Sequence, residues 1–81
     1  MRPKVLRQLL DTRPFSRFRI SLSDGHHYDV RHPELALLTR STLHIGIARR
    51  PEKLIADEVV RVSLLHIVRV ELLEEAVKKA S

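Results

Sequence analysis

Hydrophobic and polar residues alternate most regularly along "RFRISLSDG", residues 17–25. Phe18, Ile20 and Leu22 fall on one side of this segment, and arginine and serine residues fall on the other. A period of two is typical of a β-strand with one buried face and one solvated face. This segment is therefore the clearest predicted strand in the chain.

A hairpin turn is expected directly after this strand. Asp24 and Gly25 are residues that accept positive φ, so together they predict a type I′ turn. The chain then returns as "HHYDV", in which Tyr28 and Val30 are expected on the core side. Pro33 cannot donate to a strand ladder, which predicts a bend or bulge after the second strand.

The pattern continues with two further turns. "LALLT" and "TLHIGIA" predict a second hairpin around Arg40 and Ser41. "VVRVSLLHIVRVELL" is longer than the usual strand of about five or six residues, so it must turn within its length. We expect a tight turn at residues 64–66, followed by the last strand.

Helices are predicted at both ends of the chain. Residues 4–12 have apolar positions at helical spacing, and Pro14 ends the segment because proline breaks the helical ladder. The apolar face of this helix consists of Val5, Leu6, Leu9 and Leu10. Residues 73–80 contain good helix formers and predict a short helical tail.

These elements predict a mainly β (α+β) fold. A chain of 81 residues supports one modest core, so residues 1–81 are expected to form a single domain. The short N-terminal helix would precede a small, strongly bent, antiparallel SH3/Sm-like barrel of five strands over residues 15–72. Closing a bent sheet into a barrel removes its exposed edges.

Composition limits the class of protein. Cysteine is absent, which excludes a disulfide scaffold and fits a reducing cytoplasm. No apolar run approaches the roughly 20 residues that a membrane-spanning helix needs. The sequence therefore predicts a cytoplasmic protein with no membrane partner.

Positive charge is concentrated in the first part of the chain. Residues 1–53 contain eleven Lys and Arg against five Asp and Glu, a net charge of +6, whereas residues 54–81 contain four against five, a net charge of −1. A basic surface favours acidic partners such as nucleic acid. The candidate nucleic-acid-binding residues are Arg17, Arg19, Arg31, Arg49 and Arg50.

Metal and catalytic sites are not predicted. His26, His27 and His32 are close in sequence, but neighbouring residues of a strand point to opposite faces and do not converge on one ion. The chain has no glycine-rich phosphate loop, carboxylate pair or nucleophile with a base. We therefore expect a protein that is not an enzyme and that has no metal and no cofactor.

Two segments resemble those of the Sm-like family, which includes Hfq-type RNA chaperones. "ISLSDG" resembles the first family motif, and "LLHIVRVE" resembles the second in the spacing of Ile67 and Val70. The resemblance implies a small barrel, ring assembly and an RNA pocket. The family has a glycine five residues after the turn glycine, where this chain has Val30, and Pro33 could supply the bend instead.

A second resemblance rests on two segments that together extend over nearly the whole chain. The pattern RPFxxFRxxLSDGxxYxVRHPE, at residues 13–34, together with "SLLHIVRVE", at residues 63–71, resembles a group of short bacterial proteins. It implies a bacterial cytoplasmic protein and no particular activity.

Two functional hypotheses follow. In the first, the chain is a small interaction module that self-associates, or docks a protein partner, through a strand edge or its N-terminal helix. In the second, it is a weak, sequence-tolerant RNA or DNA binder that uses the basic first part of the chain.

Overall fold

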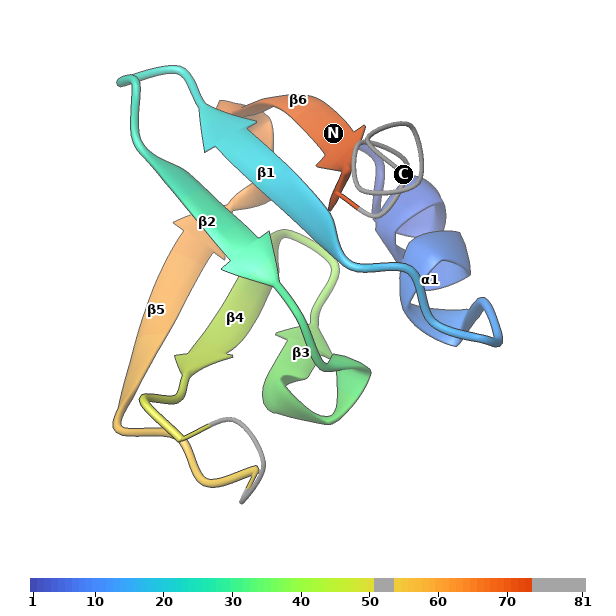
Figure 1. The fold of residues 1–81 in the computed structure, drawn as a ribbon. Helices are drawn as coiled ribbons and strands as arrows, with labels where there is room; N and C mark the ends of the chain where they lie inside the picture. The colour runs from blue at the N-terminus through green and yellow to red at the C-terminus, as the bar shows by residue number, and fades with distance from the viewer. Residues whose placement is uncertain (51–53, 74–81) are drawn as a thin grey trace.

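The computed structural model describes residues 1–50 and 54–73. Helix α1 (Pro3–Asp11) lies beside two antiparallel sheets of three strands each (Figure 1). The first sheet has the order β2-β1-β6 and consists of β1 (Phe18–Leu22), β2 (His27–Val30) and β6 (Ile67–Leu72). The second has the order β3-β4-β5 and consists of β3 (Ala36–Leu38), β4 (Thr42–Ile47) and β5 (Glu58–Ser63).

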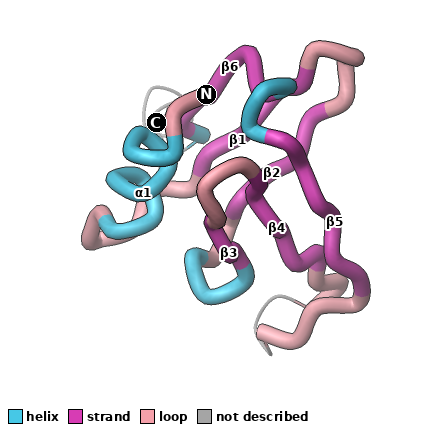
Figure 2. Tube along the Cα trace, turned by 180° about the vertical axis from the view of Figure 1, so that it is seen from behind, coloured by secondary structure: helices cyan, strands magenta, loops and turns pink. Residues whose placement is uncertain are grey.

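Two short 3-10 helices connect the sheets. η1 (Pro33–Leu35) joins β2 to β3, and η3 (Leu64–His66) joins β5 to β6 (Figure 2). The predicted bend at Pro33 and the predicted turn at residues 64–66 are thus both confirmed. The described residues form six strands and not the five of the predicted barrel, because "HHYDV" and "LALLT", on either side of Pro33, are separate strands in different sheets, β2 and β3. Within the described residues no ladder joins the two sheets, so the expected closed barrel is not formed.

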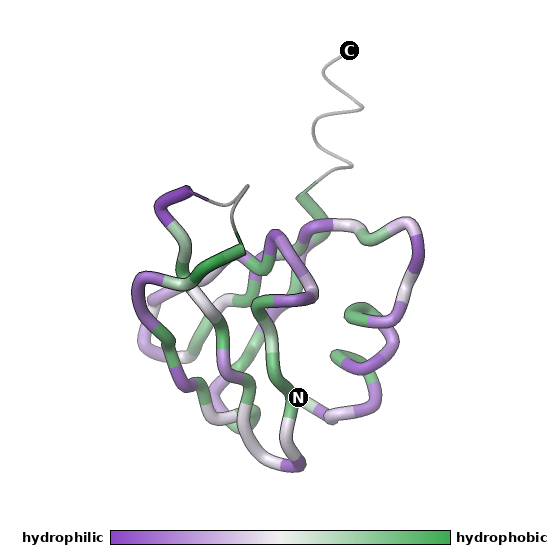
Figure 3. The backbone as a smooth tube through the Cα atoms, turned by 90° about the horizontal axis from the view of Figure 1, so that it is seen from below, coloured by the Kyte–Doolittle hydropathy of each residue, from purple (hydrophilic) through white to green (hydrophobic). Residues whose placement is uncertain are grey.

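One hydrophobic core lies between the sheets and α1. Hydrophobic and polar residues alternate along the strands (Figure 3). Each sheet therefore has one face of buried hydrophobic residues, which forms the core. The buried residues are Leu6, Leu10, Phe18, Ile20, Val30, Leu43, Ile45, Val62, Leu64 and Ile67. The ring of Phe15 packs at the margin of this core, with its centroid 6.0 Å from that of Phe18.

The first hairpin differs from the prediction in the length of its loop. Gly25 has a φ of +92°, but Asp24 does not have a positive φ, so the predicted type I′ turn is wrong. The N–H of Gly25 donates to the carbonyl of Leu22 at 3.0 Å, and the N–H of Leu22 donates to the carbonyl of His26 at 2.8 Å. The loop is therefore three residues long, with glycine at its last position.

The longer loop is the one that matches the hydrophobic pattern. It pairs Ile20 with Tyr28 and Phe18 with Val30 across the two strands. A two-residue loop would shift the register by one and place Asp29 opposite Ile20. Since a shift of one residue turns every side chain to the other face, burial of the apolar face selects the three-residue loop.

The N-terminal helix begins and ends one residue earlier than predicted. Leu6 and Leu10 are buried against the sheets, but Val5 is 42% exposed and is not part of the buried face. The N-terminal amine of Met1 donates to the carbonyl of Leu64 at 3.1 Å, which links the start of the helix to η3. Apart from Leu73, the predicted helical tail at 73–80 lies outside the described residues.

Candidate interaction surfaces

Arg19 lies in the middle of the outer face of the first sheet. It is opposite Asp29 of β2 on one side and Glu71 of β6 on the other. Its Nε donates to Asp29 Oδ1 at 2.7 Å and its Nη2 donates to Asp29 Oδ2 at 3.3 Å. This hydrogen-bonded pair holds the pKa of Asp29 below its ordinary value. The guanidinium group of Arg19 thus already forms an ion pair with a carboxylate of its own chain.

Two more arginines extend this face. Arg31 follows β2 and donates to Asp29 Oδ2 at 3.5 Å, which is longer than either contact from Arg19. Arg69 pairs with Glu71 at 2.9 Å, and its hydrogen bond is the main reason that the pKa of Glu71 is lowered. Three guanidinium groups therefore face two carboxylates on the outer side of the sheet.

The other predicted arginines lie elsewhere. Arg17 directly precedes β1, is partly buried, and accepts a hydrogen bond on its carbonyl from the N–H of Leu73 at 3.0 Å. Arg49 and Arg50 are exposed in the segment that follows β4, where the N–H of Arg49 donates to Asp57 Oδ2 at 2.6 Å. The structure therefore brings together Arg19 and Arg31, through Asp29, and does not gather all five arginines into one patch.

Exposed aliphatic side chains mark two strand edges. Among the residues that the structure describes, β5 pairs only with β4 and β6 pairs only with β1, so each of these strands has one edge without a partner strand. Val59 of β5 is 65% exposed and Val68 of β6 is 64% exposed, while Leu65, in η3 between them, is 88% exposed. Val68 lies at a β-bulge, where Ile67 pairs with Leu22 and the next ladder pair is Arg69 with Ser21. We call this segment, residues 58–72, the β5–β6 edge.

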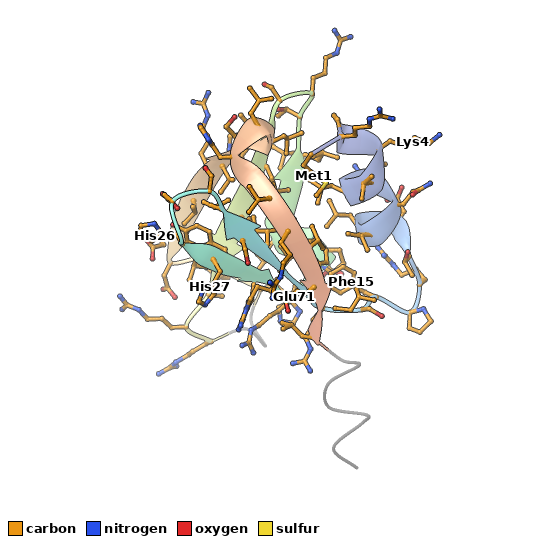
Figure 4. All side chains as sticks on the ribbon, turned by 90° about the horizontal axis from the view of Figure 1, so that it is seen from above. Met1, Lys4, Phe15, His26, His27 and Glu71 are labelled. Atoms are coloured by element: carbon orange, nitrogen blue, oxygen red, sulfur yellow. The ribbon has the colours of Figure 1, made fainter. Side chains whose placement is uncertain are left out.

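The histidines belong to several different elements. His26 is at the hairpin loop, whereas His27 and Glu71 extend from the first sheet (Figure 4). His66 Nδ1 lies 3.4 Å from Ser23 Oγ, and His44 Nε2 lies 3.1 Å from Thr42 Oγ1. Among residues 1–50 and 54–73, no three His, Asp or Glu side chains are arranged to hold a metal ion.

A pocket of about 170 Å³ lies where the two sheets separate. The end of β2 and η1 form one wall, and the end of β4 forms the other. The pocket is lined by Asp29, Val30, Arg31, His32, Leu35, Ile45, Gly46, Ile47 and Ala48. Arg31 and Ala48 thus line the same space, although 17 positions separate them in the sequence.

Three features of these surfaces were not predicted from the sequence: the burial of Asp29, the pocket, and the exposed aliphatic residues of the β5–β6 edge. Asp29 was not among the candidate residues, yet its side chain is only 18% exposed and contacts two arginines. The hairpin register places it opposite Arg19, so the correct loop length would have indicated the pair. The pocket and the exposed aliphatic residues of the β5–β6 edge depend on how distant segments pack.

No helix in the described residues has both the length and the apolar character needed to cross a membrane. The chain matches no protein-family model, no curated protein and no solved structure.

Proposed function

We propose that this chain is a non-enzymatic interaction module that self-associates through the β5–β6 edge. The observation that carries the proposal is that the three most exposed aliphatic residues of this edge, Val59, Leu65 and Val68, lie along two edge strands joined by one short turn. Unpaired backbone N–H and C=O groups on such an edge can pair with another strand. Pairing would also remove the aliphatic side chains from water.

Strand length favours this edge over the other two. β5 and β6 each have six residues, whereas β2 has four and β3 has three. A longer strand offers more backbone hydrogen bonds to a partner, and short edge strands are one way in which proteins prevent pairing. Leu37 of β3 is 64% exposed, but it stands on a strand too short to hold a partner strand well.

Pairing β5 of one copy with β6 of another would use two different surfaces. Such a head-to-tail contact forms a ring where the rotation between copies closes and a filament where it does not. The two strands would then cover the edges that a closed barrel would have removed. The resemblance to Sm-like proteins, which implies ring assembly, supports the same arrangement.

The test is the mass of the protein in solution, measured by light scattering over a range of concentrations. We expect a mass above that of one chain. Val59→Lys and Val68→Lys should each lower it, because a charge at the contact opposes pairing. Leu37→Lys is the matched control, since Leu37 is exposed to the same extent on a different edge strand.

A single-chain mass at every concentration would contradict self-association. An equal effect of all three lysine variants would contradict the choice of edge. Far-UV circular dichroism of each variant separates lost association from lost folding.

Nucleic-acid binding is the second candidate function. The observation that favours it is that Arg31, Arg49 and Arg50 are exposed and that Arg31 is held only by a long contact. Phosphate contacts make binding fall steeply with salt, whereas an apolar interface between copies does not depend on salt in this way. Ionic strength therefore separates the two candidates.

A further inference from the structure

The pocket at the separation of the two sheets has an apolar floor. Val30 of β2 and Ile45 of β4 are each 1% exposed and belong to the hydrophobic core, so the pocket opens directly onto that core. Its volume of about 170 Å³ is similar to that of an apolar cavity of about 150 Å³ that holds benzene. The space therefore matches one ring or a short branched chain.

The rim of the pocket carries a cation that its own chain holds weakly. Asp29 is the carboxylate in the lining, and Arg19 already binds both of its oxygens at 2.7 and 3.3 Å. Arg31 reaches the same carboxylate only at 3.5 Å, and its side chain is 55% exposed. Arg31 can therefore turn toward an anion in the pocket while Asp29 keeps its partner.

Other groups at the rim of the pocket also favour the binding of an anion. His32 lines the pocket, and an imidazole ring can donate a hydrogen bond in either protonation state. Arg49 and Arg50 follow directly after Ala48, which also lines the pocket. Asp57 accepts a hydrogen bond from the N–H of Arg49, so it offsets only part of this positive charge.

We propose that the pocket binds a small amphipathic carboxylate. The apolar body of the ligand, one ring or a short branched chain, lies against Val30, Ile45 and Ile47. Its carboxylate accepts hydrogen bonds from Arg31 and His32 at the rim. Apolar contacts with a few placed polar groups are the usual make-up of small-molecule sites. This proposal does not depend on self-association, because the pocket residues lie outside the β5–β6 edge.

Phenylacetate is a suitable probe, and its uncharged analogue phenylacetamide is the matched control ligand. We expect phenylacetate to shift the backbone amide resonances of Val30, Gly46 and Ile47 in a saturable way at millimolar concentration. Phenylacetamide should bind about tenfold more weakly, because it lacks the charge-assisted hydrogen bonds. Shifts that do not saturate, or that spread over the whole surface, would overturn the proposal.

One variant tests the cationic rim of the pocket, and a second tests the space that the ligand would occupy. Arg31→Gln should weaken phenylacetate binding about tenfold and leave phenylacetamide unchanged. Ala48→Phe should fill the pocket and abolish binding of both ligands. Arg61→Gln is the matched control on β5, away from the lining, and should bind both ligands as the original protein does.

Equal affinity of Arg31→Gln and the original protein for phenylacetate would overturn the role given to Arg31. Unchanged binding by a folded Ala48→Phe protein would overturn the location. If Ala48→Phe does not fold, the Arg31→Gln comparison and the positions of the shifted amides still decide the question.

Discussion

At Gly25 the backbone has a φ of +92°, and a Cβ atom built there would have no other atom within 4 Å. A side chain at this position is therefore opposed by backbone strain and not by a clash. We expect Gly25→Val to lower the free energy of unfolding by about 1–2 kcal/mol, because a β-branched residue tolerates positive φ poorly.

Urea denaturation of Gly25→Val and Gly25→Asn measures this effect. Asparagine adopts positive φ more readily than valine, so Gly25→Asn should lose less stability. Ser23→Val, in the same loop but without a positive φ, is the control. Equal denaturation midpoints for all of these proteins would show that the hairpin does not depend on this backbone angle.

The carboxylate of Asp29 links stability to pH. Its pKa is lowered in the folded protein, mainly by the hydrogen bond from Arg19. A lowered pKa means that ionised Asp29 stabilises the fold fully at pH values above the unfolded-state pKa of about 3.9. This contribution is lost as the pH falls through the folded-state pKa.

We therefore expect Asp29→Asn to be less stable than the original protein near neutral pH. The difference in urea midpoint should stay constant down to about pH 5 and shrink below about pH 4. Glu34→Gln, on the exposed side of η1, removes one carboxylate without removing this pair and should leave the midpoint nearly unchanged. A difference that grows at low pH would contradict the assigned pair.

At the scale of elements, Gly46 sets how closely the segment before β5 packs on β4. A Cβ at Gly46 would lie 3.0 Å from the Cβ of Ala56 and 3.3 Å from the Cβ of Leu35. Both neighbours would have to move, so we expect Gly46→Ala to destabilise the protein by about 1–3 kcal/mol.

A double-mutant cycle checks that the contact with Ala56 causes this loss. Ala56→Gly removes the nearer of the two methyl-sized groups, so the double variant should be more stable than the sum of the single effects predicts. If the two single effects on the free energy of unfolding simply add, then Leu35, and not Ala56, limits the space around Gly46.

The strands could be predicted from sequence because their signals are local. Alternation identified Phe18 and Ile20 as core residues, and Pro33 marked the bend. The hairpin loop could not be derived from Asp24 and Gly25 alone, since the same two residues fit loops of two or three residues. Only the requirement that Tyr28 and Val30 face the core selects between them.

The candidate sites were less predictable because they combine distant segments. Arg31 could be identified as a functional candidate, but its carboxylate partner depends on the hairpin register. The pocket brings the end of β2 next to the end of β4, and no local pattern indicates how far apart the two sheets lie there. The predicted closed barrel failed for a similar reason, since whether the two sheets join depends on packing between distant strands and not on the pattern within each strand.

At the scale of the whole molecule, the net charge of +5 remains after internal pairing. Arg7 pairs with Asp11, Arg19 with Asp29, and Arg69 with Glu71. An arginine in such an ion pair has less positive charge and fewer hydrogen-bond donors available to bind a phosphate. The arginines therefore differ in the contribution that they can make to binding an acidic partner.

This difference leads to a prediction about nucleic acid. Binding of RNA or DNA, if carried by the five predicted arginines, should be weak, similar for many sequences and lower by orders of magnitude at moderate salt than at low salt. Arg49→Gln with Arg50→Gln should reduce the salt slope by about one for each arginine removed. Arg19→Gln should change it less, because Asp29 already holds that guanidinium.

Filter binding over a series of salt concentrations, with several unrelated oligonucleotides, measures both the affinity for each sequence and the salt slope. Equal effects of Arg19→Gln and of the Arg49/Arg50 pair would show that Asp29 does not compete with phosphate. No retention of any oligonucleotide near physiological salt would remove the nucleic-acid function and leave the self-associating module. A strong preference for one sequence would require base contacts, since phosphate contacts alone carry no sequence information.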